Sequence, residues 1–195
     1  MSEKQFNTEK ELVHACLKND RIAQFELFQR FSYQLKGVCI RYMVDSDAVE
    51  DALQESFIRA FSNLKKYNFE GPLGAWLRKI TVNTCLEICR KNATLKSHLD
   101  ELQNDSNNFI VLSKSDNSIF QQLSAEELIG KINLLPIGFR TIFNLYAIEG
   151  YNHEEIGKML GISAGTSKSQ YSRARLKLQE MIKKEMDHEK KIRYV

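Results

Sequence analysis

Cations and short hydroxyl side chains are interleaved along residues 164–178, AGTSKSQYSRARLKL. Such hydroxyls can reach base edges in the major groove of duplex DNA, and guanidinium and ammonium groups bind guanine edges and phosphates. If the stretch is a helix, the residues predicted to face outward or to the side are Lys168, Ser169, Ser172, Arg173 and Arg175. We therefore expect a helix that reads duplex DNA, with a solvated basic helix as the alternative.

A second stretch, residues 67–91, interleaves aromatic side chains with cations around a turn at Gly71-Pro72 and Gly74. Unstacked bases need aromatic faces and phosphates need positive charge, so this composition is typical of a site for single-stranded nucleic acid. We expect the turn to be followed by a helix from about Ala75 to Arg90. The residues concerned are Tyr67, Phe69, Trp76, Arg78, Lys79 and Asn83. The alternative is that Trp76 and Phe69 are core residues that pin the loop.

The duplex reader needs a supporting helix and a turn, and the residues before it predict both. Asn152 can cap a helix, and Glu155 can return a hydrogen bond to it three positions later, which is a capping-box pattern. Gly161 follows where a left-handed residue is wanted, and Ser163 can cap the next helix. The pattern predicts a helix-turn-helix over residues 151–178.

Apolar residues at helical spacing predict the core on which this helix-turn-helix rests. In the reading helix the inner stripe is Ser167, Tyr171, Ala174 and Leu178. On either side of a break at Pro136–Gly138 the stripes are Leu128, Ile132 and Leu135, then Phe139, Ile142, Phe143 and Tyr146. We expect a unit of four helices.

The first 93 residues are predicted to form a separate helical bundle. Its first apolar stripes are Leu12, Ala15, Cys16, then Ile22, Phe25, Phe28, Phe31, Leu35, Val38 and Tyr42. Asp47 is expected to cap a third helix, with Glu50 at the capping-box position. That helix has the inner stripe Val49, Leu53, Phe57, Ala60 and Leu64, and the outer residues Glu50, Asp51, Gln54, Glu55 and Arg59. The acidic, amide-rich outer face is either solvated surface or a protein-docking face.

The composition of the 195 residues supports a mostly helical protein of one large or two small domains. Two prolines, nine glycines and few alternating apolar runs argue against sheets. Residues 151–195 hold ten Lys/Arg and six Asp/Glu, so a net charge of +4 lies there, against −1 for the first 150 residues. This excess coincides with the predicted duplex reader, as contact with phosphates requires.

The N-terminal residues are polar and acidic, without an apolar run long enough for a signal peptide or a membrane span, so we expect a cytoplasmic protein. The cysteines all fall in predicted helices and should be thiols in a reducing compartment: Cys16, Cys39, Cys85 and Cys89. Cys85 and Cys89 could share a metal with His14 or His98. Zinc sites normally use C-x2-C pairs, so we expect small buried cysteines, and no metal or other cofactor.

Residues 94–124 break the helical pattern with a run rich in Ser, Asn and Asp, interrupted by the apolar Phe109–Leu112. We interpret this segment as a linker between two helical domains. The two helical domains are therefore expected at residues 1–93 and 125–195.

Three stretches in this order resemble the extracytoplasmic function, or group IV, sigma factors of bacterial RNA polymerase, which belong to the sigma-70 family. They are DAVEDALQESFIRAFSNLKKY at residues 47–67, GPLGAWLRKITVNTCLEICRK at 71–91, and LLPIGFRTIFNLYAIEGYNHEEIGKMLGISAGTSKSQYSRARLKL at 134–178. The resemblance covers residues 9–183 apart from the linker. It implies an all-α fold, with a region 2 bundle and a region 4 helix-turn-helix domain. The implied function is that of a promoter-specificity subunit, not of an enzyme.

The resemblance assigns partners to the surfaces described above. In such proteins the acidic helix docks on the clamp helices of the polymerase β′ subunit, so the candidate contacts are Asp51, Gln54 and Glu55. The β flap is the second expected contact on core polymerase. The loop from Tyr67 to Gly74 matches the segment that captures a flipped base of the −10 element. The implied −10 residues are Tyr67, Asn68, Phe69, Trp76, Arg78, Lys79 and Asn83.

The resemblance also places residues 165–175 on the −35 duplex, where Arg175 would contact a phosphate and the others base edges: Lys168, Ser169, Ser172 and Arg173. An anti-sigma protein is an implied partner that would hold the protein inactive. Ser167 and Tyr171 depart from the aliphatic residues usual in the family, so the inner face of this helix is expected to pack differently. Two other functions stay open: a stand-alone regulator that binds a palindromic operator without polymerase, and a protein-interaction module whose basic surface is incidental.

Overall fold

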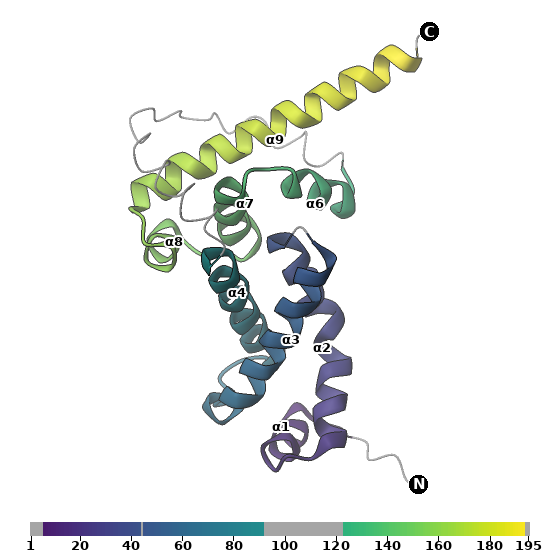
Figure 1. Cartoon of the computed structure of the whole chain (residues 1–195), viewed down its shortest axis with the longest axis vertical. Helices are drawn as coiled ribbons and strands as arrows, with labels where there is room; N and C mark the ends of the chain where they lie inside the picture. The colour runs from purple at the N-terminus through teal and green to yellow at the C-terminus, as the bar shows by residue number, and fades with distance from the viewer. Residues whose placement is uncertain (1–5, 44, 92–122, 194–195) are drawn as a thin grey trace. The chain divides into compact units, whose positions relative to one another are not determined.

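The structure of the protein, a computed structural model, describes residues 6–43, 45–91 and 123–193, with side chains up to residue 186. Every regular element in these ranges is a helix, which confirms the predicted all-α fold (Figure 1).

The chain divides into two compact units, residues 1–91 and 92–195, and each is described by itself. Of the predicted linker, only Leu123 and Ser124 are among the described residues. The apolar patch Phe109–Leu112 and the metal candidate His98 lie outside them.

Five helical elements form unit 1 in its described part. They are α1 (Glu9–Leu17), α2 (Arg21–Tyr42), α3 (Ser46–Asn63), the short 3-10 turn η1 (Leu64–Lys66) and α4 (Leu73–Lys91). Helices α2, α3 and α4 pack against one another, while α1 packs on α2 and touches η1 (Figure 1). The stripe predicted on α3 is buried throughout, because steps of three and four residues keep it on one face: Val49, Leu53, Phe57, Ala60 and Leu64.

The apolar stripe predicted for the first half of α2 is wrong. Ile22, Phe25 and Phe28 are exposed by 55%, 63% and 36% of their surface, and the buried residues are Ala23 and Leu27. Successive steps of three lag by about 60° each on a helix of 3.6 residues per turn, so such a series leaves the core face. Steps of four alternating with three stay on that face, and the apolar side chains between them are left exposed.

The N-terminus of α3 also differs from the prediction. Asp45, not Asp47, caps the helix, and its Oδ2 accepts a hydrogen bond from the backbone N of Ala48 at 3.2 Å. Asp47 lies in the first turn, where a carboxylate interacts favourably with the helix dipole. Glu50 forms an ion pair with Lys36 of α2 and so ties the two helices together.

All four cysteines are buried free thiols, as expected of small core residues. Burial raises the pKa of Cys16 to about 11, so that this thiol is protonated at neutral pH and packs as an apolar group. Within the described ranges, no cluster of three or more His, Cys, Asp or Glu side chains could hold a metal ion.

The described part of unit 2 is built around one long helix. Its elements are α6 (Ala125–Asn133), α7 (Ile137–Phe143), the π-helical turn η4 (Asn144–Ile148), α8 (His153–Leu160) and α9 (Ala164–Arg193). A capping box between Ser124 and Glu127 begins α6. Helices α6, α7 and α8 all pack on α9 (Figure 1), and the shared core consists of Ile132, Leu135, Phe143, Ala174 and Leu178.

Candidate functional site

The turn between α8 and α9 forms as predicted. Asn152 Oδ1 accepts a hydrogen bond from the backbone N of Glu155 at 2.9 Å, and Glu155 Oε2 accepts one from the backbone N of Asn152 at 2.8 Å. Gly161 ends α8 with φ +72°, a left-handed conformation that glycine adopts without steric cost. Ser163 Oγ accepts from the backbone N of Thr166 at 2.9 Å. These local bonds define where α8 ends and where α9 begins.

The first turns of α9 present most of the predicted duplex contacts to solvent. Lys168 is exposed, and Ser172, Arg173 and Arg175 are partly exposed. Ser169 is 5% exposed, and its hydroxyl donates to the backbone O of Thr166 at 3.0 Å. The prediction that Ser169 faces outward is therefore wrong. Because both α7 and α8 pack against α9, the buried side of its first turns is wider than a single stripe.

His153, which sequence reasoning did not single out, supports the start of the reading helix. Its Nδ1 lies 2.9 Å from Ser167 Oγ, and its ring stacks on Tyr146 with centroids 4.2 Å apart. The ring of Tyr146 also lies 4.5 Å from that of Tyr171. Tyr146 was predicted to be a core residue, but 39% of its surface is exposed. The unusual Ser167 and Tyr171 both take part in this contact.

The electrostatics of this stack favour an uncharged His153. Burial, and after it the neighbouring Lys168, lower the pKa of His153 below its usual value. A neutral imidazole stacks on an aromatic ring without the cost of burying a charge. Near neutral pH, the positive charge beside the reading helix therefore comes from Lys168 and the arginines.

The aromatic loop has a buried wall and an exposed ring. Tyr67 is 7% exposed, and its hydroxyl donates to the backbone O of Gly71 at 2.6 Å. Its ring lies 5.5 Å from that of Trp76 and 4.9 Å from that of Phe69. Phe69 is 39% exposed and has φ +62°, in the left-handed region. The burial of Tyr67 is at odds with a direct DNA contact, and the loop offers Phe69 as its outward-facing aromatic ring.

Gly74 was predicted to lie in the loop, but helix α4 begins at Leu73, so Gly74 belongs to the helix. A Cβ on Gly74 would lie 3.1 Å from the ring of Phe31, which explains a glycine at this close approach. Lys79 and Asn83 are one helical turn apart and share a face of α4. The exposed members of the predicted single-strand site are Asn68, Arg78, Lys79 and Asn83, in addition to Phe69.

The outer face of α3 combines polar and apolar side chains. Asp51 and Gln54 are exposed. Ile58 follows four residues after Gln54 and is 60% exposed, so it shares their face. Sequence reasoning missed Ile58, although the absence of Ile58 from the predicted inner stripe was a usable signal.

Glu55, the third predicted docking residue, takes part in an ion-pair network. Its Oε1 accepts from Arg59 Nε at 2.7 Å, and a second nitrogen of Arg59 donates to Glu87 Oε2 on α4 at 2.6 Å. Hydrogen bonds to Glu55 and then Glu87 raise the pKa of Arg59. The network joins α3 to α4 and leaves Glu55 less available to an external partner than Asp51.

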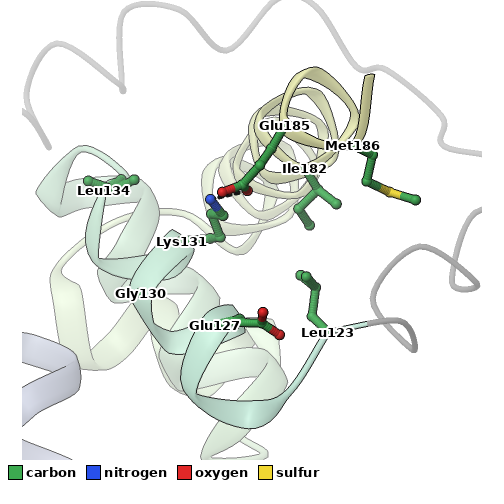
Figure 2. A pocket seen from close by; sticks show the side chains of 8 residues that line it. All are labelled: Leu123, Glu127, Gly130, Lys131, Leu134, Ile182, Glu185 and Met186. Atoms are coloured by element: carbon green, nitrogen blue, oxygen red, sulfur yellow. Dashed lines mark ion pairs between the residues drawn. The ribbon is translucent and has the colours of Figure 1, made fainter. Parts of the chain in front are cut away.

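Unit 2 has a groove between α6 and the C-terminal half of α9, with a volume of about 580 Å³ (Figure 2). Lys131 of α6 and Glu185 of α9 form an ion pair across it. Leu134, at one end of the groove, is 67% exposed. The other lining residues are Leu123, Glu127, Gly130, Ile182 and Met186. The groove therefore combines apolar side chains with one bridging ion pair.

Two family models match this chain, one in each unit. The model described as "Sigma-70 region 2" matches residues 27–94, which include α3, the aromatic loop and α4. The model described as "Sigma-70, region 4" matches residues 125–178, from α6 to the reading half of α9. The chain belongs to the sigma-70 family. It is an alternative sigma factor, a DNA-binding subunit that directs RNA polymerase to promoters, as the sequence predicted.

The relatives of this sigma factor belong to the extracytoplasmic function group. It is 28% identical to the ECF RNA polymerase sigma-E factor of Haemophilus influenzae over 181 residues, which span 90% of this chain and 95% of that one. It is also 28% identical to the ECF RNA polymerase sigma factor SigM of Mycobacterium tuberculosis over 172 residues, 88% of this chain and 83% of that one. The sigma factor RpoE of Bartonella quintana shares the fold, with a TM-score of 0.50, 24% identity, and coverage of 81% of this chain and 95% of that one.

Helix α1 and the C-terminal half of α9 lie outside the ranges that the family models match. Helix α1 precedes residue 27, and the part of α9 that lines the groove follows residue 178. None of the helices that the structure describes is long and apolar enough to cross a membrane.

Proposed function

We propose that this sigma factor reads a promoter in two parts while it is bound to core polymerase. Three surfaces support the proposal: the exposed side of the first turns of α9, the loop that carries Phe69, and the outer face of α3. Their combination on one chain is the observation that carries it. A stand-alone regulator would need the α9 surface but would have no use for an exposed aromatic loop.

The −35 element is read as duplex by α9. Lys168 and Arg173 lie in its first turns, the part of a reading helix that meets base edges in the major groove. Ser172 supplies a partly exposed hydroxyl, and Arg175 supplies a cation for a phosphate. Ser169 is left out of the contact set, because its hydroxyl is buried and bonded within its own helix.

The −10 element is bound as a melted strand, with one base stacked on Phe69. Tyr67 packs on that ring from the inside of the loop, and Trp76 packs on Tyr67. Flipping a base costs a few kcal/mol, and stacking on an aromatic side chain returns about 1–3 kcal/mol. Polar and charged contacts must supply the rest, and the exposed residues proposed for them are Asn68, Arg78, Lys79 and Asn83.

Core polymerase is bound through α3, whose docking face consists of Asp51, Gln54 and Ile58. The proposed partner is the pair of clamp helices on the β′ subunit. Glu55 contributes from the edge of this face, because its carboxylate is already paired with Arg59. A polar rim around an exposed apolar side chain is the usual composition of a protein interface.

The groove between α6 and α9 is the proposed seat of the polymerase β flap. Ile182 lies fourteen residues after Lys168, which corresponds to about 21 Å along the helix. A protein in the groove therefore leaves the DNA-reading turns open. Leu134, 67% exposed in the free protein, would be covered by such a partner.

We further propose that the protein is cytoplasmic, that it leaves catalysis to the polymerase, and that an anti-sigma protein restrains it. The sigma factor RpoE of Bartonella quintana was crystallised with the anti-sigma factor NepR. In this chain, unit 1 exposes large apolar side chains that a protein partner can cover: Ile22, Phe25, Tyr33 and Ile58.

Transcription in vitro with purified core polymerase and a library of genomic fragments tests the proposal. The wild-type chain should associate with core and start transcription at a discrete set of promoters, whose sequences the library identifies. Asp51→Arg should weaken core association by about tenfold or more, because it reverses a charge on the docking face.

Glu180→Arg is the matched control, since it makes the same charge reversal at an exposed position of α9 that does not line the groove. It should leave core association unchanged. A wild-type chain that neither binds core nor starts transcription at any promoter would contradict the proposed function.

A further inference from the structure

Helix α1 contacts the aromatic loop at three points, although it precedes the range matched by the region 2 model. Glu9 Oε2 accepts a hydrogen bond from the backbone N of Leu73 at 3.2 Å, across 64 residues of sequence. The rings of His14 and Phe69 have centroids 5.7 Å apart. The ammonium of Lys10 lies 5.9 Å from the centre of the same Phe69 ring. Helix α1 therefore packs directly against the aromatic loop and the first residue of α4.

These contacts come from a fixed support, because α1 is anchored in the core of unit 1. Leu12 and Val13 are fully buried, and Thr8 caps the N-terminus of the helix. Just before α1, the backbone O of Phe6 accepts a hydrogen bond from Arg30 of α2 at 2.7 Å. Exposed residues on a helix held in this way keep a defined position relative to the loop.

Phe69 needs such support. Its φ of +62° is unfavourable for a residue with a Cβ, and it persists only where neighbouring contacts compensate. The ring of Tyr67 packs on it from within the loop, while Lys10 and His14 approach it from α1. Phe69 still keeps 39% of its surface exposed. The Phe69 ring is therefore held in a solvent-accessible position, with the Lys10 ammonium and the His14 imidazole beside it.

Glu9 acts at the other end of the loop. Leu73 is the first residue of α4, where a backbone N–H has no partner within the helix and a carboxylate interacts favourably with the helix dipole. Trp76 follows within the same first turn of α4. Glu9 therefore holds the start of α4, the turn that carries Trp76.

We propose that α1 forms a third wall of the −10 site, an inference that rests on the proposed function of the loop. Glu9 is a positioning residue that holds the loop and the start of α4. Lys10 and His14 bind the backbone phosphate of the single strand whose base stacks on Phe69. A stacked base brings its own phosphate close to the edge of the ring, and these two side chains lie beside that ring.

The positioning role is tested in holoenzyme assembled from core polymerase and the full chain, on a promoter recovered from the transcription library. A 2-aminopurine in the −10 element reports base unstacking through its fluorescence. Glu9→Ala should slow promoter opening by about tenfold, because it removes a hydrogen bond to a charged acceptor. Core association and affinity for −35 duplex should not change. Glu9→Gln keeps an acceptor oxygen and should open the promoter within about twofold of wild type.

The phosphate contact is tested by the salt dependence of binding between holoenzyme and the single-stranded −10 strand. Lys10→Ala should reduce the slope of log affinity against log salt by about 0.7, the value for one phosphate contact on a single strand. A purely structural role would leave this slope unchanged. Lys18→Ala removes the same charge beyond the other end of α1 and should keep the wild-type slope.

Each role has its own contrary result. Wild-type opening by Glu9→Ala would overturn the positioning role, and a wild-type salt slope for Lys10→Ala would overturn the phosphate contact. Both results would leave the proposed function intact. By contrast, a wild-type holoenzyme that opens no promoter would remove that function and this inference with it. Lys10 is exposed, so its variant tests the proposal even where Glu9→Ala destabilises the fold.

Discussion

A serine hydroxyl can read DNA only where it faces solvent, and two serines of α9 differ in this respect. Ser172 is partly exposed, whereas Ser169 is 5% exposed and donates to the backbone O of Thr166. A hydroxyl bonded to its own helix would have to give up that bond to reach a base. In the proposed function, the reading surface therefore centres on Ser172 with the cations Lys168 and Arg173.

Lys168→Ala and Arg173→Ala should each weaken binding to the −35 duplex by about 1–3 kcal/mol where the side chain contacts a base. Such a loss should be concentrated at one base pair. Arg175→Ala, the proposed phosphate contact, should weaken all sequences alike and reduce the salt slope by about 0.9. Competition binding of holoenzyme to a panel of single-base −35 variants measures both patterns.

Ser169→Ala is the control for this surface. It should change −35 affinity by less than about 0.5 kcal/mol, as for a substitution away from the interface. A loss as large as that of Arg173→Ala would show that the reading face has been placed wrongly on α9.

Residue-level features could be predicted where they depend on neighbours in sequence. The capping box of Asn152 and Glu155 joins residues three positions apart, so its pattern is visible in the chain. The burial of Ser169 and the contact between Ser167 and His153 depend on how α7 and α8 pack against α9. No local sequence pattern predicts this packing. The cap of α3 was misplaced because Asp45 and Asp47 are both plausible caps two residues apart.

At the scale of elements, the sequence predicts where the helices lie better than it predicts which face of each helix is buried. The stripe of α3 was correct, because its steps of three and four admit one buried face. On α2 the apolar residues are compatible with two different buried faces. Only the packing of the neighbouring helices decides that Leu27 is buried and Phe25 is exposed. The contact between Glu9 and Leu73 spans 64 residues, so the periodicity of a helix holds no record of it.

The junction of α8 and α9 depends on the missing side chain of Gly157. A Cβ there would lie 2.7 Å from the backbone O of Ile162, closer than real Cβ contacts occur. Gly157→Ala should therefore force α8 and the turn apart and destabilise unit 2 by about 1–3 kcal/mol, despite the better helix propensity of alanine. Urea unfolding followed by circular dichroism gives the free energy, and −35 duplex binding should weaken in parallel.

Gly130→Ala provides the comparison within the same unit. A Cβ on Gly130 of α6 would meet nothing within 4 Å, so this change should stabilise the helix by about 0.5–1 kcal/mol. If Gly157→Ala stabilised the protein as Gly130→Ala does, the close approach at Ile162 would not exist in solution.

At the scale of the whole molecule, two modest DNA contacts gain strength from being joined. Binding of one contact makes the second intramolecular, at an effective concentration set by what connects them. In the proposed function that connection is core polymerase, on which α3 and the groove of unit 2 both dock. The distance between the −35 and −10 elements then becomes a third determinant of promoter choice, besides the two sequences.

Inserting about 5 bp between the two elements turns one of them to the opposite face of the duplex and moves it about 17 Å away. Initiation by holoenzyme should fall to near background, as measured by run-off transcription. The chain without core should bind both promoters equally in a competition assay, because the −35 contact alone is made.

An insertion of about 10 bp returns both elements to the same face of the duplex but adds about 34 Å between them. If polymerase sets the distance, this second insertion should not restore initiation, whereas recovery would mean that the two units read DNA independently of core.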